Sequence, residues 1–452
     1  MSIINALFNG NNVDNIQEVF KDPDTTSTEM QKNINECYDL FYAGEKETED
    51  NCQRIPVFII DRLVKTSFSE YKTYAKNDKL NELLKKIDCI KKPAMQSILL
   101  GGEAFIKPIM RDNDIDFLII DRNCFIPLGR DHNGKITKIG LTETTVRSGA
   151  YYTLVETRTA GKELTIEYKL YRSDRKGILG RQVPLNSLDK YEGLEDIIRL
   201  PVEGNLGMAQ IKTPVLNCVD GSQDGICVYS AASKLIRRLN RNEKQMDDEF
   251  DLSQKRIIVS QDMFRKDDKG RPILYDKVFQ ALDYDEGEVG IKDYSPEIRE
   301  QSYLNRKNEY LRNIESLCGF KRGLLSNVEE QQRTAKEITD SEGSYNLTII
   351  DFQEMWEDGI KELINICATF SSIYNNGFSD VKADDIIFDF GDGVLYNRDK
   401  TFNELLSLVA AGVLDARHLI GWYFEIDTTT PEGLAKAEAM MPEMERLLNE
   451  NE

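Results

Sequence analysis

The chain has 452 residues, more than one hydrophobic core accommodates, and its length predicts about three domains. Its 78 acidic residues outnumber the 58 lysines and arginines, and the resulting net charge of −20 disfavours a protein that wraps nucleic acid in a basic face. Eight cysteines without a C-x-x-C pair, together with only two histidines, predict free thiols in a reducing compartment and neither a zinc site nor a cofactor.

The N-terminal part is expected to be helical. Residues 1 to about 50 are polar and predict a short helical arm, and helical periodicity follows from Ile55 to Tyr74 and from Lys79 to Ile90. The first residues lack the basic region of a signal peptide. The apolar run from Leu405 to Leu414 is about half as long as a membrane span. We therefore expect a protein that is made, and stays, in cytoplasm.

Between Ser97 and Tyr171 the pattern changes to that of strands. Turn residues at Asp131 to Gly134 and at Thr159 to Lys162 predict hairpins. The expected strands are Ile98 to Leu100, Phe105 to Ile109, Phe117 to Ile120, Ile136 to Leu141, Tyr151 to Arg158 and Leu164 to Leu170. The sequence thus predicts an α+β domain built on antiparallel hairpins, closing near Pro214.

A long helix is predicted from Ile226 to Leu252, with Asp224 and Gly225 as its cap and Leu235 and Leu239 on its apolar stripe. Basic side chains occupy its first two-thirds: Lys234, Arg237, Arg238, Arg241 and Lys244. Acidic side chains follow at its end: Asp247, Asp248, Glu249 and Asp251. The helix dipole favours the opposite order. The order fits a solvated face, and it equally fits pairing between the subunits of a ring or a band that faces DNA.

A small β module is predicted next. Arg256 to Ser260 reads as a strand, Lys266 to Arg271 as a hairpin tip, and Pro272 to Tyr284 as the returning strand. A second long helix then begins at Ser295 and Pro296 and ends at Cys318, with Gly319 just beyond it. Two long helices therefore flank the β module.

The C-terminal third begins with a polar segment, Lys321 to Arg333, which predicts a loop. A long amphipathic helix around Trp356 spans Tyr345 to Ile366. One strand is expected after it, Ile386 to Phe390. Three helices then follow, with a break at Gly412 between the first two: Thr401 to Ala411, Ala416 to Phe424, and Thr430 to Leu448.

Catalytic and metal motifs are weak. Asp112 to Asp116 starts like a calcium loop, but Phe117 and Asn123 replace the glycine and the glutamate that such a loop requires. Gly101 to Phe105 has one carboxylate where metal-assisted nucleotidyl transfer would want two. Asp389 to Gly391 lacks the companion motifs of a kinase, and no Walker lysine loop occurs. His132 and His418 read as structural histidines.

Five stretches in chain order resemble one known family. They are Leu100 to Pro108, Lys212 to Asn217, the helix opening at Val228, Gln332 to Ile338 with the helix after it, and Ile387 to Gly393. Together they resemble the portal proteins of tailed bacteriophages, in the subfamily of siphophages that infect Gram-positive hosts. An acidic surface agrees with this resemblance, because a tube through which DNA slides must not grip phosphate.

The resemblance implies a portal fold, a dodecameric ring divided into wing, stem, clip and crown around a channel. The implied divisions are 1–225 N-terminal arm and wing, 226–254 first stem helix, 255–294 clip, 295–319 second stem helix, 320–338 tunnel-loop region, 339–392 wing helix and strand, and 393–452 crown. Lys321, Arg322 and Arg333 would line the tunnel loop, the five basic residues from Lys234 to Lys244 would belong to the stem, and Lys266, Lys269 and Arg271 would form a docking tip on the clip.

The resemblance also implies partners rather than an enzyme activity: double-stranded DNA in the channel, the terminase large subunit, a head-completion adaptor, the major capsid protein and a scaffold. The protein would reside at the portal vertex of the virion, through which the genome is packaged and ejected, with no membrane involved. Two alternatives stay open. The chain could be another capsid or neck structural protein, or an enzyme whose site is assembled from dispersed carboxylates.

Overall fold

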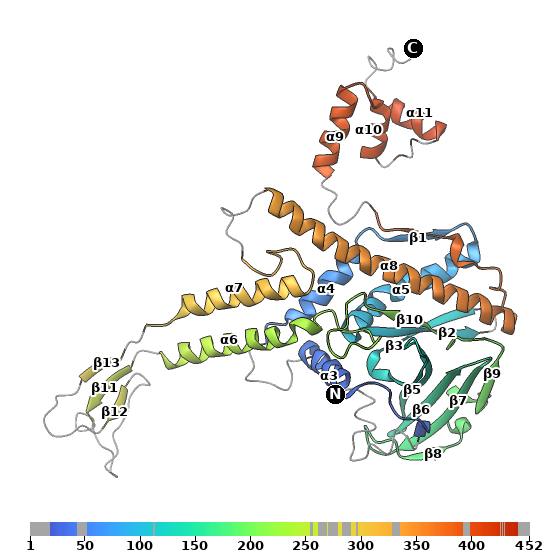
Figure 1. Cartoon of the computed structure of the whole chain (residues 1–452), viewed down its shortest axis with the longest axis horizontal. Helices are drawn as coiled ribbons and strands as arrows, with labels where there is room; N and C mark the ends of the chain where they lie inside the picture. The colour runs from blue at the N-terminus through green and yellow to red at the C-terminus, as the bar shows by residue number, and fades with distance from the viewer. Residues whose placement is uncertain are drawn as a thin grey trace. The chain divides into compact units, whose positions relative to one another are not determined.

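The computed structural model describes residues 19–42, 52–111, 114–253, 256–260, 269, 279–282, 291–294, 297–327, 335–391, 398–424, 426, 428 and 430–441. The chain is an α+β protein, as predicted, and it separates into two units between Phe390 and Gly391. Most of the predicted elements lie in the first unit, which spans residues 1–390 (Figure 1).

Three helices open the first unit: α3 (Thr28–Tyr42), α4 (Ile55–Ser67) and α5 (Asp78–Gly101). Asn77 caps α5 by accepting the backbone N–H groups of Lys79 and Leu80. The predicted helix to Tyr74 is too long, because β1 (Lys72–Ala75) replaces its end. The predicted strand at Ile98 is wrong, because that residue lies in the last turns of α5. A short buried apolar run satisfies both periodicities, and only the left-handed Gly102 marks the helix end.

Two antiparallel sheets follow. The smaller has the order β10-β2-β3, with β2 (Glu103–Arg111), β3 (Asp114–Ile120) and β10 (Ala209–Lys212). The larger runs β4-β5-β6-β7-β8, with β9 also paired to β7. Its strands are β4 (Phe125–Arg130), β5 (Ile136–Arg147), β6 (Ala150–Ala160), β7 (Leu164–Ser173), β8 (Arg181–Val183) and β9 (Ile197–Leu200).

The predicted hairpins of the larger sheet are confirmed. The Asp131 carboxylate accepts the N–H groups of Asn133 and Lys135 in the turn that joins β4 to β5, and Ala160 pairs with Leu164 across the next predicted turn. Strand β4 was not predicted. Its Pro127 and Gly129 stand where the pairing with β5 slips out of register, and such residues are typical of turns.

Two long helices flank the predicted β module. They are α6 (Ser233–Leu252) and α7 (Glu300–Leu317), which lie side by side (Figure 1). A short 3-10 turn at Ser230–Ala232 precedes α6, so the helix starts seven residues later than Ile226. Asp224 is not its cap, because its carboxylate is buried and paired with Arg130. Gly319 ends α7 with a positive φ, as predicted.

Within the β module the predicted hairpin is wrong. Its strands are β11 (Arg256–Ser260), β12 (Phe279–Leu282) and β13 (Ile291–Tyr294). The strand after the predicted tip, β12, runs parallel to β11, whereas the antiparallel partner of β11 is β13. A two-strand hairpin must be antiparallel, so a longer connection joins β11 to β12.

The long helix α8 (Ala335–Tyr374) extends beyond both predicted ends and packs against α4, β2 and β10. Its Trp356 is fully buried and donates Nε1–H to the Tyr71 hydroxyl at 3.1 Å. The last strand, β14 (Ile386–Asp389), pairs antiparallel with β1, so the strand that follows α4 and the last strand of the first unit form one small sheet.

The second unit contains α9 (Arg398–Ala410), α10 (Ala416–Tyr423) and α11 (Pro431–Ala439). Gly412 has a φ of 69° and breaks the chain between the first two helices, as predicted. The Thr430 hydroxyl caps α11 by accepting the Gly433 N–H. The helix predicted to Leu448 is described only to Ala439, and residues 442–452 lie outside the described part.

Candidate functional site

The pair α6 and α7 is held together by polar contacts. Lys307 Nζ lies 3.0 Å from Glu243 Oε2, and Asn242 donates to the carbonyl of Tyr303. At the far end Arg299 meets the Glu249 carboxylate through its side chain at 2.6 Å and through its backbone N–H at 3.0 Å. Part of the acidic end of α6 is therefore used inside the chain, which explains some of the unusual charge order without a neighbouring subunit.

Hydrogen bonds dominate the electrostatics at Glu249. The bonds from Arg299, and next the one from Tyr303, lower the pKa of the Glu249 carboxyl to about 2. The hydrogen bond between Tyr303 and Glu249 also raises the pKa of the Tyr303 hydroxyl. Glu249 is consequently ionised at physiological pH and stays paired with α7.

Of the five basic residues predicted for the stem, some lie together at one hollow and the others do not. Arg237 pairs with Glu36 of α3 at 2.8 Å, so it fastens α6 to the N-terminal arm. Arg238 and Arg241 are exposed and line one hollow of about 190 Å³ with Gln245 and two residues of α7, Arg306 and Tyr310. Lys234 is exposed and Lys244 half-buried, and neither lines this hollow.

Arg306 is the member of this group that the sequence did not indicate, because it comes from the other long helix. Its Nε donates to the Tyr310 hydroxyl at 2.9 Å. No carboxylate lines the hollow among the residues that the structure describes. Three guanidinium groups around this hollow suit a phosphate or a carboxylate supplied from outside the chain, and Arg306 also lines a neighbouring hollow with Asp248 and Glu249.

The predicted tunnel loop begins as an ordered turn. The Glu315 carboxylate of α7 is buried, and it accepts the N–H groups of Gly323, Leu325 and Ser326 and the Ser326 hydroxyl. Lys321 is half-buried and Arg322 exposed in this turn, whereas Arg333 lies outside the described residues. The first part of the segment is therefore anchored to α7 rather than freely projecting.

The predicted clip tip falls mostly outside the described residues. Lys266 and Arg271 are not described, and Lys269 is an exposed turn residue. What the structure gives of this module is its three-stranded sheet, so the docking role of the three basic residues stays a prediction.

The acidic and histidine motifs have structural partners. Asp114 and Asp116 both pair with Lys86, and His418 contacts the Thr428 hydroxyl through Nδ1. All eight cysteines are free thiols. Within the described ranges no group of three or more histidine, cysteine or acidic side chains could hold a metal ion, and no helix there is long and apolar enough to cross a membrane.

We compared the chain with known protein families, curated proteins and solved structures. The family described as "Phage portal protein, SPP1 Gp6-like" matches residues 76–452. Among solved structures the chain is similar to "Neck of native GTA particle computed with C12 symmetry", with a TM-score of 0.44 and 9% identity, covering 84% of this chain and 92% of that one. No curated protein matches.

The family match covers α5, both antiparallel sheets, both long helices, the β module, α8 and the second unit. It takes precedence over the alternatives that the sequence left open, a different capsid protein or an enzyme with dispersed carboxylates. The family is one of structural proteins and not of enzymes. The chain belongs to the phage portal protein family.

Proposed function

We propose that twelve copies of the chain form a ring with a central channel at one capsid vertex, through which double-stranded DNA enters during packaging and leaves during ejection. The observation that carries this proposal is the portal family match over residues 76–452. The order of elements also supports it. A β module, β11–β13, stands between the two long helices α6 and α7, and this order suits a stem with a clip at its end.

In this ring the N-terminal arm, both antiparallel sheets and α8 would form the wing. The helices α6 and α7 would form the stem, β11–β13 the clip, residues 320–338 the tunnel-loop region, and residues 393–452 the crown. The clip would seat the terminase large subunit and later a head-completion adaptor, and the outer surface would meet the major capsid protein and the scaffold. The protein would reside in host cytoplasm until the capsid assembles around it.

The charge distribution fits a conduit that holds DNA loosely. A net charge of −20 per subunit repels phosphate over most of the surface. Local attraction would come from Arg238, Arg241 and Arg306 on the stem, and from Lys321, Arg322 and Arg333 at the tunnel loop. Contacts of this kind are independent of base sequence and weaken with salt, as sliding requires.

Charge reversal tests the stem assignment. The double variant Arg238→Glu with Arg241→Glu should form rings of normal size but package less DNA. Arg175→Glu with Lys176→Glu is the matched control, because it reverses two exposed charges between β7 and β8. Failure to form rings would assign the arginines to contacts between subunits, and normal packaging would remove them from DNA handling.

Charge reversal at Lys266, Lys269 and Arg271 tests the clip. Rings should persist while terminase binding weakens, because a charged, reversible surface loses its electrostatic complementarity. Unchanged terminase binding by the triple variant would remove the docking assignment and leave the conduit proposal standing.

A further inference from the structure

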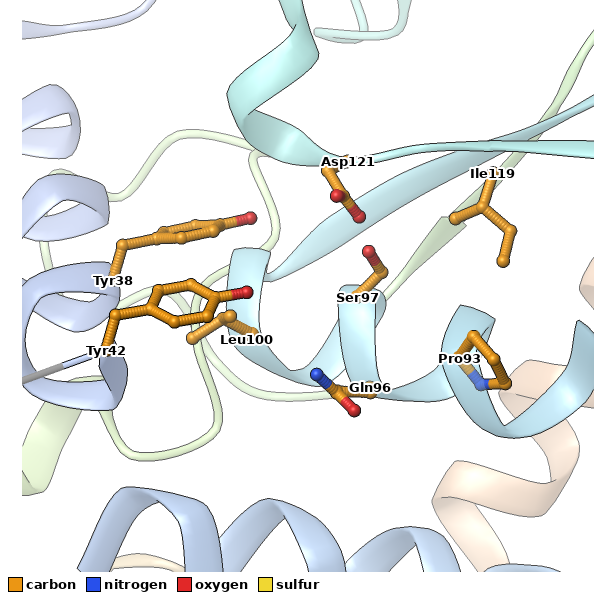
Figure 2. Close-up of a pocket in the computed structure, with 8 residues that line it drawn as sticks. All are labelled: Tyr38, Tyr42, Pro93, Gln96, Ser97, Leu100, Ile119 and Asp121. Carbon is orange, nitrogen blue, oxygen red and sulfur yellow. The ribbon is translucent and has the colours of Figure 1, made fainter. Parts of the chain in front are cut away.

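A second concave site lies away from the stem, between α3, α5 and the end of β3. This pocket has a volume of about 240 Å³ and is lined by Tyr38, Tyr42, Pro93, Gln96, Ser97, Leu100, Ile119 and Asp121. Figure 2 shows the two tyrosine hydroxyls pointing toward Asp121 and Ser97. The volume is below the range of pockets for drug-sized ligands, so it suits one small group.

The carboxylate of Asp121 has no partner of its own within the described part of the chain. Asp121 stands at the N-terminal end of a 3-10 turn, Arg122–Cys124, where aspartate commonly caps the backbone, yet its side chain makes no capping bond. The adjacent Arg122 does not neutralise it, because that guanidinium is directed to Glu103, Thr26 and the carbonyl of Phe125. Burial raises the pKa of the Asp121 carboxyl.

Tyr38 provides an independent argument that the pocket accepts a polar group. Its side chain is only 6% exposed, and within the described residues its hydroxyl makes no hydrogen bond. An unsatisfied buried polar atom costs free energy unless something supplies the bond. The hydroxyl points into the pocket (Figure 2), so a group bound there would supply the missing partner.

The remaining lining defines the chemistry of that group. The rings of Tyr38 and Tyr42 stack with centroids 6.2 Å apart and provide aromatic surface, which attracts cations. Gln96 and Ser97 add oxygen acceptors, while Pro93, Leu100 and Ile119 provide an apolar wall. An acid, aromatic rings and an apolar wall together match a positive charge carried on a short aliphatic stem.

We propose that this pocket binds one organic cation, an ammonium or guanidinium group on a short aliphatic chain, with Asp121 as the counterion. The cation is either a lysine or arginine side chain of a second copy of the protein or a free alkylamine. Both share the chemistry that the pocket recognises. The proposal is independent of the DNA conduit, since it concerns residues outside the stem, clip and tunnel loop.

The test titrates n-butylguanidinium into the full-length protein by calorimetry, with n-pentanol as the uncharged control. Wild type should bind the guanidinium and not the alcohol. Asp121→Asn should weaken binding at least about tenfold, because it removes a charge-assisted contact. Glu192→Gln, which removes an exposed carboxylate outside the pocket, should bind as wild type does. Tyr42→Leu changes a largely exposed ring and should weaken binding without unfolding the protein.

The result also identifies the source of the cation. Binding by wild type that Asp121→Asn loses shows a site open to free amines. Absence of binding, combined with weaker self-association of Asp121→Asn but not of Glu192→Gln, shows that a side chain of another copy already fills it. The proposal is overturned if Asp121→Asn binds the guanidinium as well as wild type. It is also overturned if wild type does not bind and both variants associate normally.

Discussion

Gly102 and Gly225 cross backbone against backbone. A Cβ added to Gly225 would lie 2.0 Å from the carbonyl oxygen of Gly102, and one added to Gly102 would lie 2.3 Å from that of Gly225. Bonds beside the crossing join three stretches that are distant in the sequence: Thr213 donates to the carbonyls of Gly102 and Ile226, and the Val228 N–H donates to that of Leu99. Three of the family-like motifs therefore meet at one point.

Gly225→Ala should lower the free energy of unfolding by about 1–3 kcal/mol, because the added methyl group meets backbone that cannot rotate away. Chemical denaturation measures the loss. Gly161→Ala is the control, since its Cβ would have only an ordinary contact, 3.6 Å from the carbonyl oxygen of Glu163. Equal stability of the two variants would show that the crossing relaxes freely.

Glu156 joins the two antiparallel sheets through a buried ionic cluster. Its carboxylate contacts Arg158 Nε and Lys107 Nζ at 2.5 Å each, and Arg158 also donates to the carbonyls of Leu206 and Gly207. Glu156→Gln should destabilise the protein by about 3–5 kcal/mol, since it leaves two buried cations uncompensated. Glu143→Gln breaks an exposed pair with Lys190 and should cost less than about 1 kcal/mol in the same denaturation experiment.

Glu315 fixes the start of the proposed tunnel loop. Glu315→Ala removes the acceptor shared by Gly323, Leu325 and Ser326, so the N–H groups of these three residues should exchange with solvent faster. Hydrogen exchange with mass spectrometry reads this out by peptide. Glu309→Ala, also on α7, is the control. If the N–H groups of residues 321–327 exchange as slowly in Glu315→Ala as in wild type, the contact with Glu315 is not required to order this turn.

Glu249 should make the α6–α7 contact sensitive to acid. Its folded-state pKa of about 2 lies below the ordinary value of 4.5, so the pairing contributes stability above about pH 4.5. That contribution is lost as pH falls from about 4.5 toward 2. The difference in melting temperature between wild type and Glu249→Gln should therefore be present at pH 6 and shrink across this window. A difference that is constant with pH would show that ionised Glu249 does not matter.

Local signals account for what the sequence predicted correctly. Apolar periodicity located α6 and α8, and Gly319 marked the end of α7. Asp131 marked the turn between β4 and β5, and Gly412 marked the break after α9. Buried Leu239 and half-buried Leu235 follow the predicted stripe of α6. These features depend on neighbours within a few residues, which is why a single sequence contains them.

Long-range pairing was not predictable in the same way. Apolar periodicity does not indicate that β12 pairs with β11 in parallel. Arg306 joins Arg238 only because α6 and α7 lie side by side, and Asp121 faces Tyr38 only because β3 ends beside α3. Each of these relationships joins segments whose spacing along the chain contains no trace of the contact.

Single-particle imaging of the purified full-length protein shows whether the chain assembles into the proposed ring. We expect closed rings with a central hole, whose class averages resolve a stem narrower than the wing. If the protein stays a monodisperse monomer or a closed dimer even at high protein concentration, the proposal that this chain forms the DNA channel of a portal vertex is contradicted.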